Sequence, residues 1–148
     1  MTNNRFPQRI ICLTEEGTEI LYHLNEQHRL VGISGFTYRP PQARKEKPKV
    51  STFIDAKFDE ILALKPDLVV GYSDMQADIA AELIRRGINV FIFNHRTVEE
   101  ILNMIIQFTS LIGCQEKGIK LVKTYEAKLE QIKNNASLLP YQPTVFFE

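Results

Sequence analysis

The segment FDEILALKPDLVVGY, residues 58–72, decides how this sequence is interpreted, because a helical pattern gives way to a strand pattern within a few residues. Phe58 to Leu64 places apolar side chains at helical spacing, and Lys65-Pro66 ends the helix because proline cannot continue it. Residues 67–72 (DLVVGY) are a short apolar run, typical of a strand that is covered on both faces. A helix followed at once by a buried strand indicates an α/β fold.

The same alternation continues on both sides of this segment. Further strands are expected at residues 10–13, 30–33 and 89–93, and further helices at 16–25 and 76–86. The stretch 36–49 is rich in proline, arginine and lysine, and we predict that it is mostly loop. The predicted fold class is therefore α/β, with a four-stranded parallel sheet and helices on both faces.

From Thr97 onward, helices follow one another. Thr97 and Glu100 form a capping box that opens a helix, and this helix continues to a break at Gly113. A second helix of roughly 36 Å is predicted over about 115–138. Residues 144–148 (TVFFE) have the pattern of an opening strand.

This order suggests more than one unit. We interpret residues 1–112 as an α/β lobe, 113–139 as a connecting helix, and 140–148 as the start of a second lobe. The chain is thus expected to be the first lobe of a two-lobe protein. An apolar strand without a partner exposes its edge, so we also expect two copies to associate through the C-terminal helix and strand.

Composition narrows the possible partners. The chain of 148 residues has 18 Lys and Arg against 18 Asp and Glu, and 44% of its residues are hydrophobic. A net charge of zero gives no electrostatic argument for binding nucleic acid or an anionic membrane. The first eight residues are polar, and no apolar run near the N-terminus has the length of a secretory leader.

Metal-binding and catalytic patterns are also missing from the sequence. Cys12 and Cys114 lie in apolar segments without ligand-like spacing, so we interpret them as buried hydrophobic residues. His23 and His28 do not share a helix face. This spacing of cysteines and histidines predicts no resident metal. Since the serines lack a nucleophile elbow, we predict no catalytic residues either.

Polar and aromatic residues follow each predicted strand. Parallel sheets bind ligands beyond the carboxyl ends of their strands, so these residues are the candidate binding site. The candidates are Thr14, Glu15, Glu16, Phe36, Tyr38, Arg39, Phe53, Tyr72, Ser73, Asn94 and His95.

Some of these residues allow a second interpretation. Glu15 and Glu16 would also suit the positive end of a helix dipole, without facing a cationic or polar ligand. The aromatic rings would cover an edge of the core if they do not line a pocket for a flat or bulky apolar ligand.

Several motifs occur in an order that resembles a known family. These motifs are RIICL (9–13), LVGIS (30–34), PPQAR (40–44) and ILALKPDLV (61–69). The order resembles the helical-backbone substrate-binding proteins of ABC importers for cobalamin and iron–siderophores, and the vitamin B12-binding members most of all. The resemblance covers nearly all of residues 8–148.

This resemblance implies that cobalamin, an iron–siderophore or haem binds between two α/β lobes joined by one long rigid helix, with no intrinsic cofactor. Phe53 and Tyr72 stand where the B12-binding members place tryptophans near the corrin, and Phe36 matches an aromatic residue. Arg39 and the Thr14-Glu15-Glu16 segment depart from the family pattern.

The resemblance also implies a docking site. Asp59 aligns with an acidic residue that docks to arginines of the ABC permease, and Glu60 lies beside it. The expected function is that of the substrate-binding component of an ABC importer, not an enzyme, in the periplasm. The alternative is a cytoplasmic protein or enzyme that handles corrinoids or haem with the same fold, which the lack of a leader favours.

Overall fold

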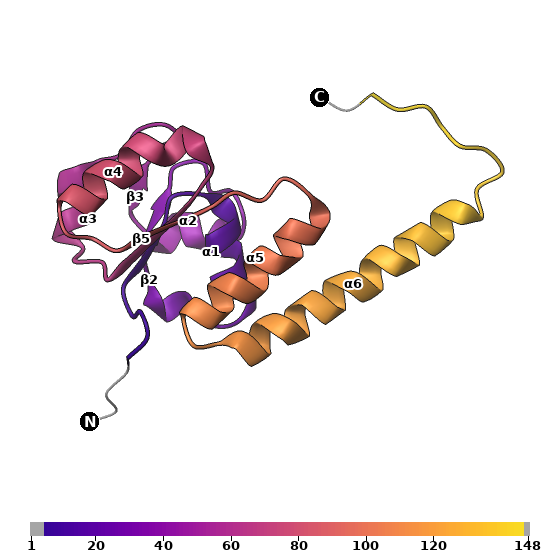
Figure 1. Ribbon diagram of the computed structural model, residues 1–148, viewed down its shortest axis with the longest axis horizontal. Helices are drawn as coiled ribbons and strands as arrows, with labels where there is room; N and C mark the ends of the chain where they lie inside the picture. The colour runs from indigo at the N-terminus through magenta and orange to yellow at the C-terminus, as the bar shows by residue number, and fades with distance from the viewer. Residues whose placement is uncertain (1–4, 147–148) are drawn as a thin grey trace.

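The computed structural model describes residues 5–146, and its five parallel strands form one sheet in the order β3-β2-β1-β4-β5 (Figure 1). The strands are β1 (Ile10–Cys12), β2 (Leu30–Ser34), β3 (Lys49–Ser51), β4 (Leu68–Tyr72) and β5 (Val90–Phe93). The helices are α1 (Glu15–His23), α2 (Pro41–Glu46), α3 (Phe58–Ala63), α4 (Ala77–Arg85), α5 (Val98–Leu111) and α6 (Gln115–Ser137). Short 3₁₀ turns lie at Gln27–Arg29 and Asp74–Gln76.

Strand β1 lies at the centre of the sheet and is completely buried. Ile10 and Cys12 belong to one hydrophobic core, which α1, α5 and the start of α6 cover. Ile11 and Leu13 point to the opposite core, beneath α3 and α4. The predicted α/β class, with helices on both faces of a parallel sheet, is thereby confirmed, as Figure 1 shows.

The predicted number of strands was wrong, because the sheet has five strands and not four. The additional strand β3 pairs with β2 through Ile33 and Lys49 and through Ser34 and Ser51. Val50 is completely buried, but a run of three residues is too short to show the apolar periodicity of a strand. Helix α2 also lies within the stretch predicted as loop. Pro41 stands in its first turn, where a missing N–H costs nothing.

Helices α5 and α6 form an antiparallel pair beyond the sheet. The predicted capping box is present, since Thr97 Oγ1 accepts a hydrogen bond from the Glu100 amide and the Glu100 side chain accepts one from the Thr97 amide. The helices approach closely at Gly118, where a Cβ atom would collide with the side chain of Thr109. The predicted long helix is thus observed, and it packs on α5 through its N-terminal half.

The C-terminal half of α6 projects away from the α/β domain, as Figure 1 shows. Its apolar stripe is consequently exposed, with Leu129 41% and Ile132 63% accessible. The strand predicted for 144–148 is not formed at residues 144–146, because no neighbouring strand pairs with them. Residues 147 and 148 lie outside the described residues.

A partly buried ion-pair cluster fastens the start of α6 to the lobe. Glu26, only 7% exposed, lies with Oε2 2.9 Å from Nε of Arg29, and it accepts a hydrogen bond from Lys117 of α6. Arg29 also donates to the carbonyl of Ile112 at 2.7 Å, and Lys117 donates to the carbonyl of Leu24 at 3.2 Å. Both ends of the α5–α6 connection are therefore held by the segment that follows α1.

We predict that Glu26→Gln lowers the free energy of unfolding by about 1–3 kcal/mol at neutral pH. Burial acts to raise the pKa of Glu26, but the Lys117 hydrogen bond and the charges of Arg29 and Lys117 hold that pKa below its ordinary value. A lowered folded pKa means that the stabilisation is complete above the unfolded pKa of about 4.3 and is lost as pH falls through the folded value.

Urea unfolding of wild type and Glu26→Gln at neutral pH and at about pH 3 measures this effect. The difference between the two proteins should shrink in acid. Glu130→Gln, at an exposed position on α6, is the matched control and should change stability by less than about 0.5 kcal/mol. Equal stability of wild type and Glu26→Gln at neutral pH would contradict the role of this cluster.

Candidate functional site

The segments that follow the five strands meet at one edge of the sheet, because all strands are parallel. We call these segments the edge loops: residues 13–16, 35–40, 52–57, 73–76 and 94–97. Ten of the eleven residues that the sequence predicts for ligand binding lie in them, and the other, Tyr72, is the last residue of β4, directly before the fourth edge loop. The parallel topology thus brings together side chains that are up to about 80 residues apart in the sequence.

The first two edge loops are joined by an ion pair. Arg39 Nε lies 2.9 Å from Glu15 Oε1, and the Tyr38 amide donates to the other oxygen of Glu15 at 3.0 Å. Partial burial acts to raise the pKa of Glu15, but the hydrogen bonds from Arg39 and Tyr38 and the Arg39 charge hold that pKa below its ordinary value. Glu15 is therefore ionised at neutral pH. Glu15 also stands in the first turn of α1. An interaction with the helix dipole is therefore compatible with the predicted role of Glu15 toward a ligand.

The last two edge loops meet in an aromatic cluster. The rings of Tyr72 and His95 lie 4.6 Å apart between centroids, and the Tyr72 hydroxyl donates to the His95 carbonyl at 3.1 Å. Arg96 lies over the Tyr72 ring, donates to its hydroxyl, and is 3.4 Å from the carboxylate of Asp74. His95 Nε2 is 3.9 Å from Glu16 Oε1, which links this cluster to the first edge loop.

Gln76 braces three edge loops from within. Its side chain is completely buried and donates to the carbonyls of Leu13 at 3.3 Å and Phe53 at 3.1 Å. Its Oε1 accepts from the Tyr72 amide at 2.9 Å. Gly71 makes room for this amide, because a Cβ there would collide with Gln76 Oε1. One residue therefore fixes the loops after β1, β3 and β4 relative to each other.

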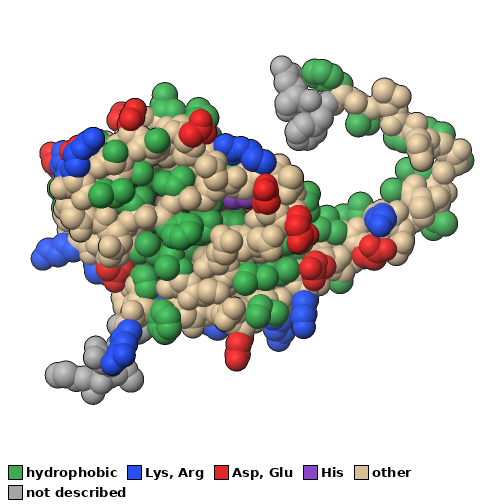
Figure 2. Space-filling view, in the orientation of Figure 1, with side chains coloured by type: hydrophobic (Ala, Val, Ile, Leu, Met, Phe, Trp, Pro, Cys, Tyr) green, Lys and Arg blue, Asp and Glu red, His purple; other side chains and the backbone are tan. Residues whose placement is uncertain are grey.

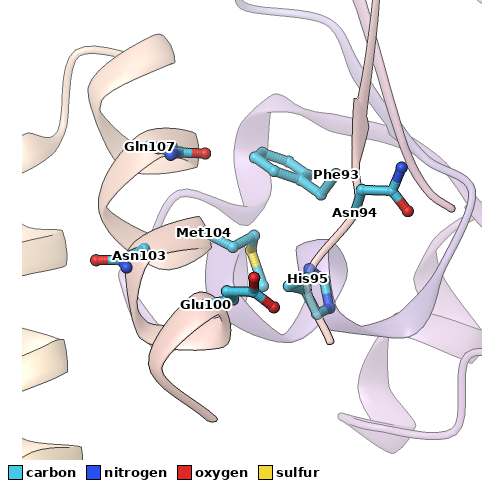
Figure 3. A pocket seen from close by; sticks show the side chains of 7 residues that line it. All are labelled: Phe93, Asn94, His95, Glu100, Asn103, Met104 and Gln107. Carbon is cyan, nitrogen blue, oxygen red and sulfur yellow. The ribbon is translucent and has the colours of Figure 1, made fainter. Parts of the chain in front are cut away.

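A cavity of about 220 Å³ lies beside His95, between the end of β5 and helix α5. Figure 3 shows that the side chains of Glu100 and Met104 on α5 point toward His95, and that Phe93 also lines the cavity. His95 Nδ1 is buried and has no hydrogen-bond partner among residues 5–146. This volume is below the usual range for a whole ligand, so the cavity suits one substituent of a larger ligand.

Large apolar side chains remain exposed on the edge loops. Phe36 is 54% and Tyr38 63% accessible, and Ile54 and Met75 are exposed as well. Figure 2 shows hydrophobic side chains gathered on the visible face of the lobe, with a histidine recessed among them. Phe36 and Tyr38 therefore do not cover the core, and their part in a pocket stays a prediction.

The remaining predicted residues differ in accessibility. Thr14 and Ser73 are buried, and Ser73 holds the 3₁₀ turn through a hydrogen bond that its Oγ accepts from the Met75 amide at 3.3 Å. Asn94 is exposed and lines the cavity, and Phe53 is partly buried. Asp59, by contrast, lies outside the edge loops on α3, fully exposed and 3.4 Å from Arg86.

Gln76, Arg96 and Asp74 are not among the residues that the sequence predicts for ligand binding. Asp74 stands two residues after β4 and Arg96 three residues after β5, and that position alone would have included them. Gln76 gives no such indication, because it lies at the beginning of a predicted helix, where glutamine is usually exposed. Only the folded chain places its amide beneath the edge loops.

Within residues 5–146, no three His, Cys, Asp or Glu side chains are arranged to hold a metal ion. No helix in the same range has the length and apolar character needed to cross a bilayer. The edge loops present aromatic rings, hydrogen-bonding groups and paired charges.

The sequence matches the family model described as periplasmic binding protein over residues 10–148. The chain belongs to the periplasmic binding protein family. The resemblance expected from the sequence motifs is thus confirmed.

Similar members of this family give more detail. A vitamin B12-binding protein of Vibrio campbellii is 33% identical over 127 residues, which make up 85% of this chain and 46% of that protein. An uncharacterized ABC transporter substrate-binding lipoprotein of Bacillus subtilis, YvrC, is 27% identical over 154 residues, covering 100% of this chain and 48% of that protein. The chain spans about half the length of the curated relatives it matches.

Solved structures of binding proteins are also similar to this chain over about half of their length. The periplasmic vitamin B12 binding protein BtuF of Vibrio cholerae is similar with a TM-score of 0.77 and 26% identity, over 89% of this chain and 52% of that one. The periplasmic haem-binding protein RhuT from Roseiflexus has a TM-score of 0.83 at 22% identity, over 92% of this chain and 52% of that one. The second likeness establishes the common fold alone.

We predict that Gln76→Leu lowers the free energy of unfolding by about 1–3 kcal/mol, because it leaves buried polar groups of the edge loops without partners. Gln131→Leu, an exposed change of the same chemistry on α6, should cost less than about 0.5 kcal/mol. Thermal unfolding of both variants beside wild type measures the difference. Equal losses in the two variants would show that the Gln76 amide does not brace the loops.

Proposed function

We propose that this chain forms one wall of a ligand-binding cleft in the substrate-binding component of an ABC importer. The observation that carries this proposal is the set of exposed aromatic rings on the edge loops, beside the Tyr72–His95 pair, in a chain of the periplasmic binding protein family. Open rings at this edge would be left in water unless a ligand or a second wall covered them.

The ligand we propose is cobalamin or a related metal chelate. Corrins and porphyrins are broad, flat and partly apolar, so aromatic side chains can lie against their faces. The vitamin B12-binding protein of Vibrio campbellii and BtuF of Vibrio cholerae support the corrinoid. The cavity beside His95 would then receive one polar substituent of the ring system.

We propose that the protein binds its ligand and does not catalyse a reaction on it. The relatives are described as binding proteins, and this supports the importer component over a corrinoid- or haem-handling enzyme with the same fold. We propose an extracytoplasmic location, in the periplasm or on a lipid anchor, which the family and the Bacillus subtilis lipoprotein support.

We also propose that α6 connects residues 1–112 to a second lobe that begins near residue 140. The exposed apolar stripe of α6 and the exposed Leu138, Tyr141 and Phe146 support this, because such side chains are usually covered in a complete protein. Where a second lobe does not cover them, the same residues would let two copies of the chain associate.

Tyr72→Ala should weaken cyanocobalamin binding by about 1–3 kcal/mol, because the variant removes a ring from the centre of the proposed wall. Calorimetric titration of wild type, Tyr72→Ala and the control Tyr141→Ala measures this. Tyr141 is exposed on the C-terminal segment, away from the edge loops, so its replacement should leave the affinity unchanged. The same affinity for all three proteins would remove Tyr72 from the site.

For permease docking we propose Asp59 and Glu60. Both lie in the first turn of α3, with side chains that are fully and 55% exposed, respectively. Their nearest cations, Arg86 and Lys57, form only surface pairs with them, and such pairs are weak. These carboxylates therefore remain accessible to a cationic partner surface.

The double change Asp59→Ala and Glu60→Ala should reduce capture of detergent-solubilised ABC permease at low salt, where charge pairs are least screened. Stability should change by less than about 0.5 kcal/mol per site. The control replaces Glu116 and Glu126, two exposed carboxylates on α6, by alanine and should retain capture. Undiminished capture by the Asp59 and Glu60 variant would exclude these residues from docking.

A further inference from the structure

The charges of the edge loops favour one class of ligand. The loops contain more carboxylates than cations, and each cation has a carboxylate within 4 Å. The carboxylates are those of Glu15, Glu16, Asp55 and Asp74, and the cations are Arg39, Lys57 and Arg96. Lys57 forms only a weak surface pair with Glu60, but an anionic ligand approaching this edge would meet two arginines, Arg39 and Arg96, that already face carboxylates.

Of these ion pairs, the Arg39–Glu15 pair is the most firmly held. Arg39 is 72% exposed, so its guanidinium reaches the open edge, but Glu15 is only 22% exposed and is fixed by two hydrogen bonds. Glu19 adds a second carboxylate at 3.8 Å from Arg39 Nη2. Because Glu15 cannot turn away easily, Arg39 stays neutralised when a ligand arrives.

Two more arginines near the edge are also occupied. Arg96 is held by the Tyr72 hydroxyl and by Asp74, as described above. Arg44 of α2 donates to the carbonyls of Gly35 and Thr37 and lies over the Tyr38 ring. The Arg44 guanidinium therefore stabilises the loop after β2. Among residues 5–146, Glu16 has no lysine or arginine nitrogen within 4 Å, and only His95 Nε2 lies within that distance as a possible cation, which leaves an excess of negative charge.

We infer that Glu15 is a specificity-determining residue, which masks Arg39 so that the site selects chelates with uncharged side groups and rejects those with carboxylates. This inference rests on the proposed function, since it concerns the same cleft. It goes further by naming the charge of the ligand and the residue that sets it. The physical reason is that an anionic side group would face Glu15 and Glu16 without gaining a free cation.

A matched pair of corrins tests the inference. Dicyanocobinamide has amide side groups, whereas dicyanocobyrinic acid has carboxylates on the same ring. At low salt, the wild-type chain should bind the amide form about tenfold more tightly or better, because the carboxylates are repelled and little screened. Glu15→Gln should reduce this preference about fivefold or more, since it leaves Arg39 with only Glu19, 3.8 Å away, as a carboxylate partner. Spectrophotometric titration of each protein with each corrin gives the ratio of affinities.

Two controls separate this effect from net charge and from folding. Glu116→Gln makes the same charge change on α6 and should leave the preference unchanged. In the double variant Glu15→Gln and Arg39→Gln, the gain for the carboxylate form should disappear, which a general structural effect of Glu15 would not produce.

The outcomes distinguish the two levels of the proposal. Equal binding of both corrins by wild type, or a loss of preference as large in Glu116→Gln as in Glu15→Gln, would overturn the masking role while leaving the binding site in place. If neither corrin bound to any of the proteins, the corrinoid function would fail, and this inference with it.

Discussion

The burial of β1 on both faces is the constraint on which the rest of the structure depends. Ile10 and Cys12 need one hydrophobic layer, and Ile11 and Leu13 need another on the opposite side. Helices must therefore cover both faces, which requires crossover connections and parallel strands. Parallel strands in turn place all their carboxyl ends at one edge. The candidate site follows from this requirement, because the five segments that leave the strands meet at this edge.

Collecting the loops at one edge is not enough to make a binding surface, since loops without internal support would move independently. The buried amide of Gln76 joins the loops after β1, β3 and β4, and the Glu15–Arg39 pair joins those after β1 and β2. The Tyr72–His95 contact adds the loop after β5. These few contacts join the five edge loops to each other, and the rings of Phe36 and Tyr38 are exposed on them.

The sequence was sufficient for the features that depend on local pattern. The helix at 58–63, the strand at 68–72 and the capping box at Thr97 each have a short-range cause, and the structure contains all of them. Strand β3 was missed because it forms through pairing with β2 and not through its own pattern. The bracing role of Gln76 was not predictable, since its partners are distant in the sequence. The ligand roles of the edge-loop residues stay predictions.

An NMR titration of the isotope-labelled 148-residue chain with cyanocobalamin tests the central claim most directly, because it locates weak binding residue by residue. The account predicts chemical-shift changes in the amides of the edge loops, largest around Tyr72 and His95 and absent from the opposite edge of the sheet at Asn25, Lys65 and Gly87. Changes confined to that opposite edge, or no changes at all, would contradict the assignment of the carboxyl edge as one wall of a corrinoid-binding cleft.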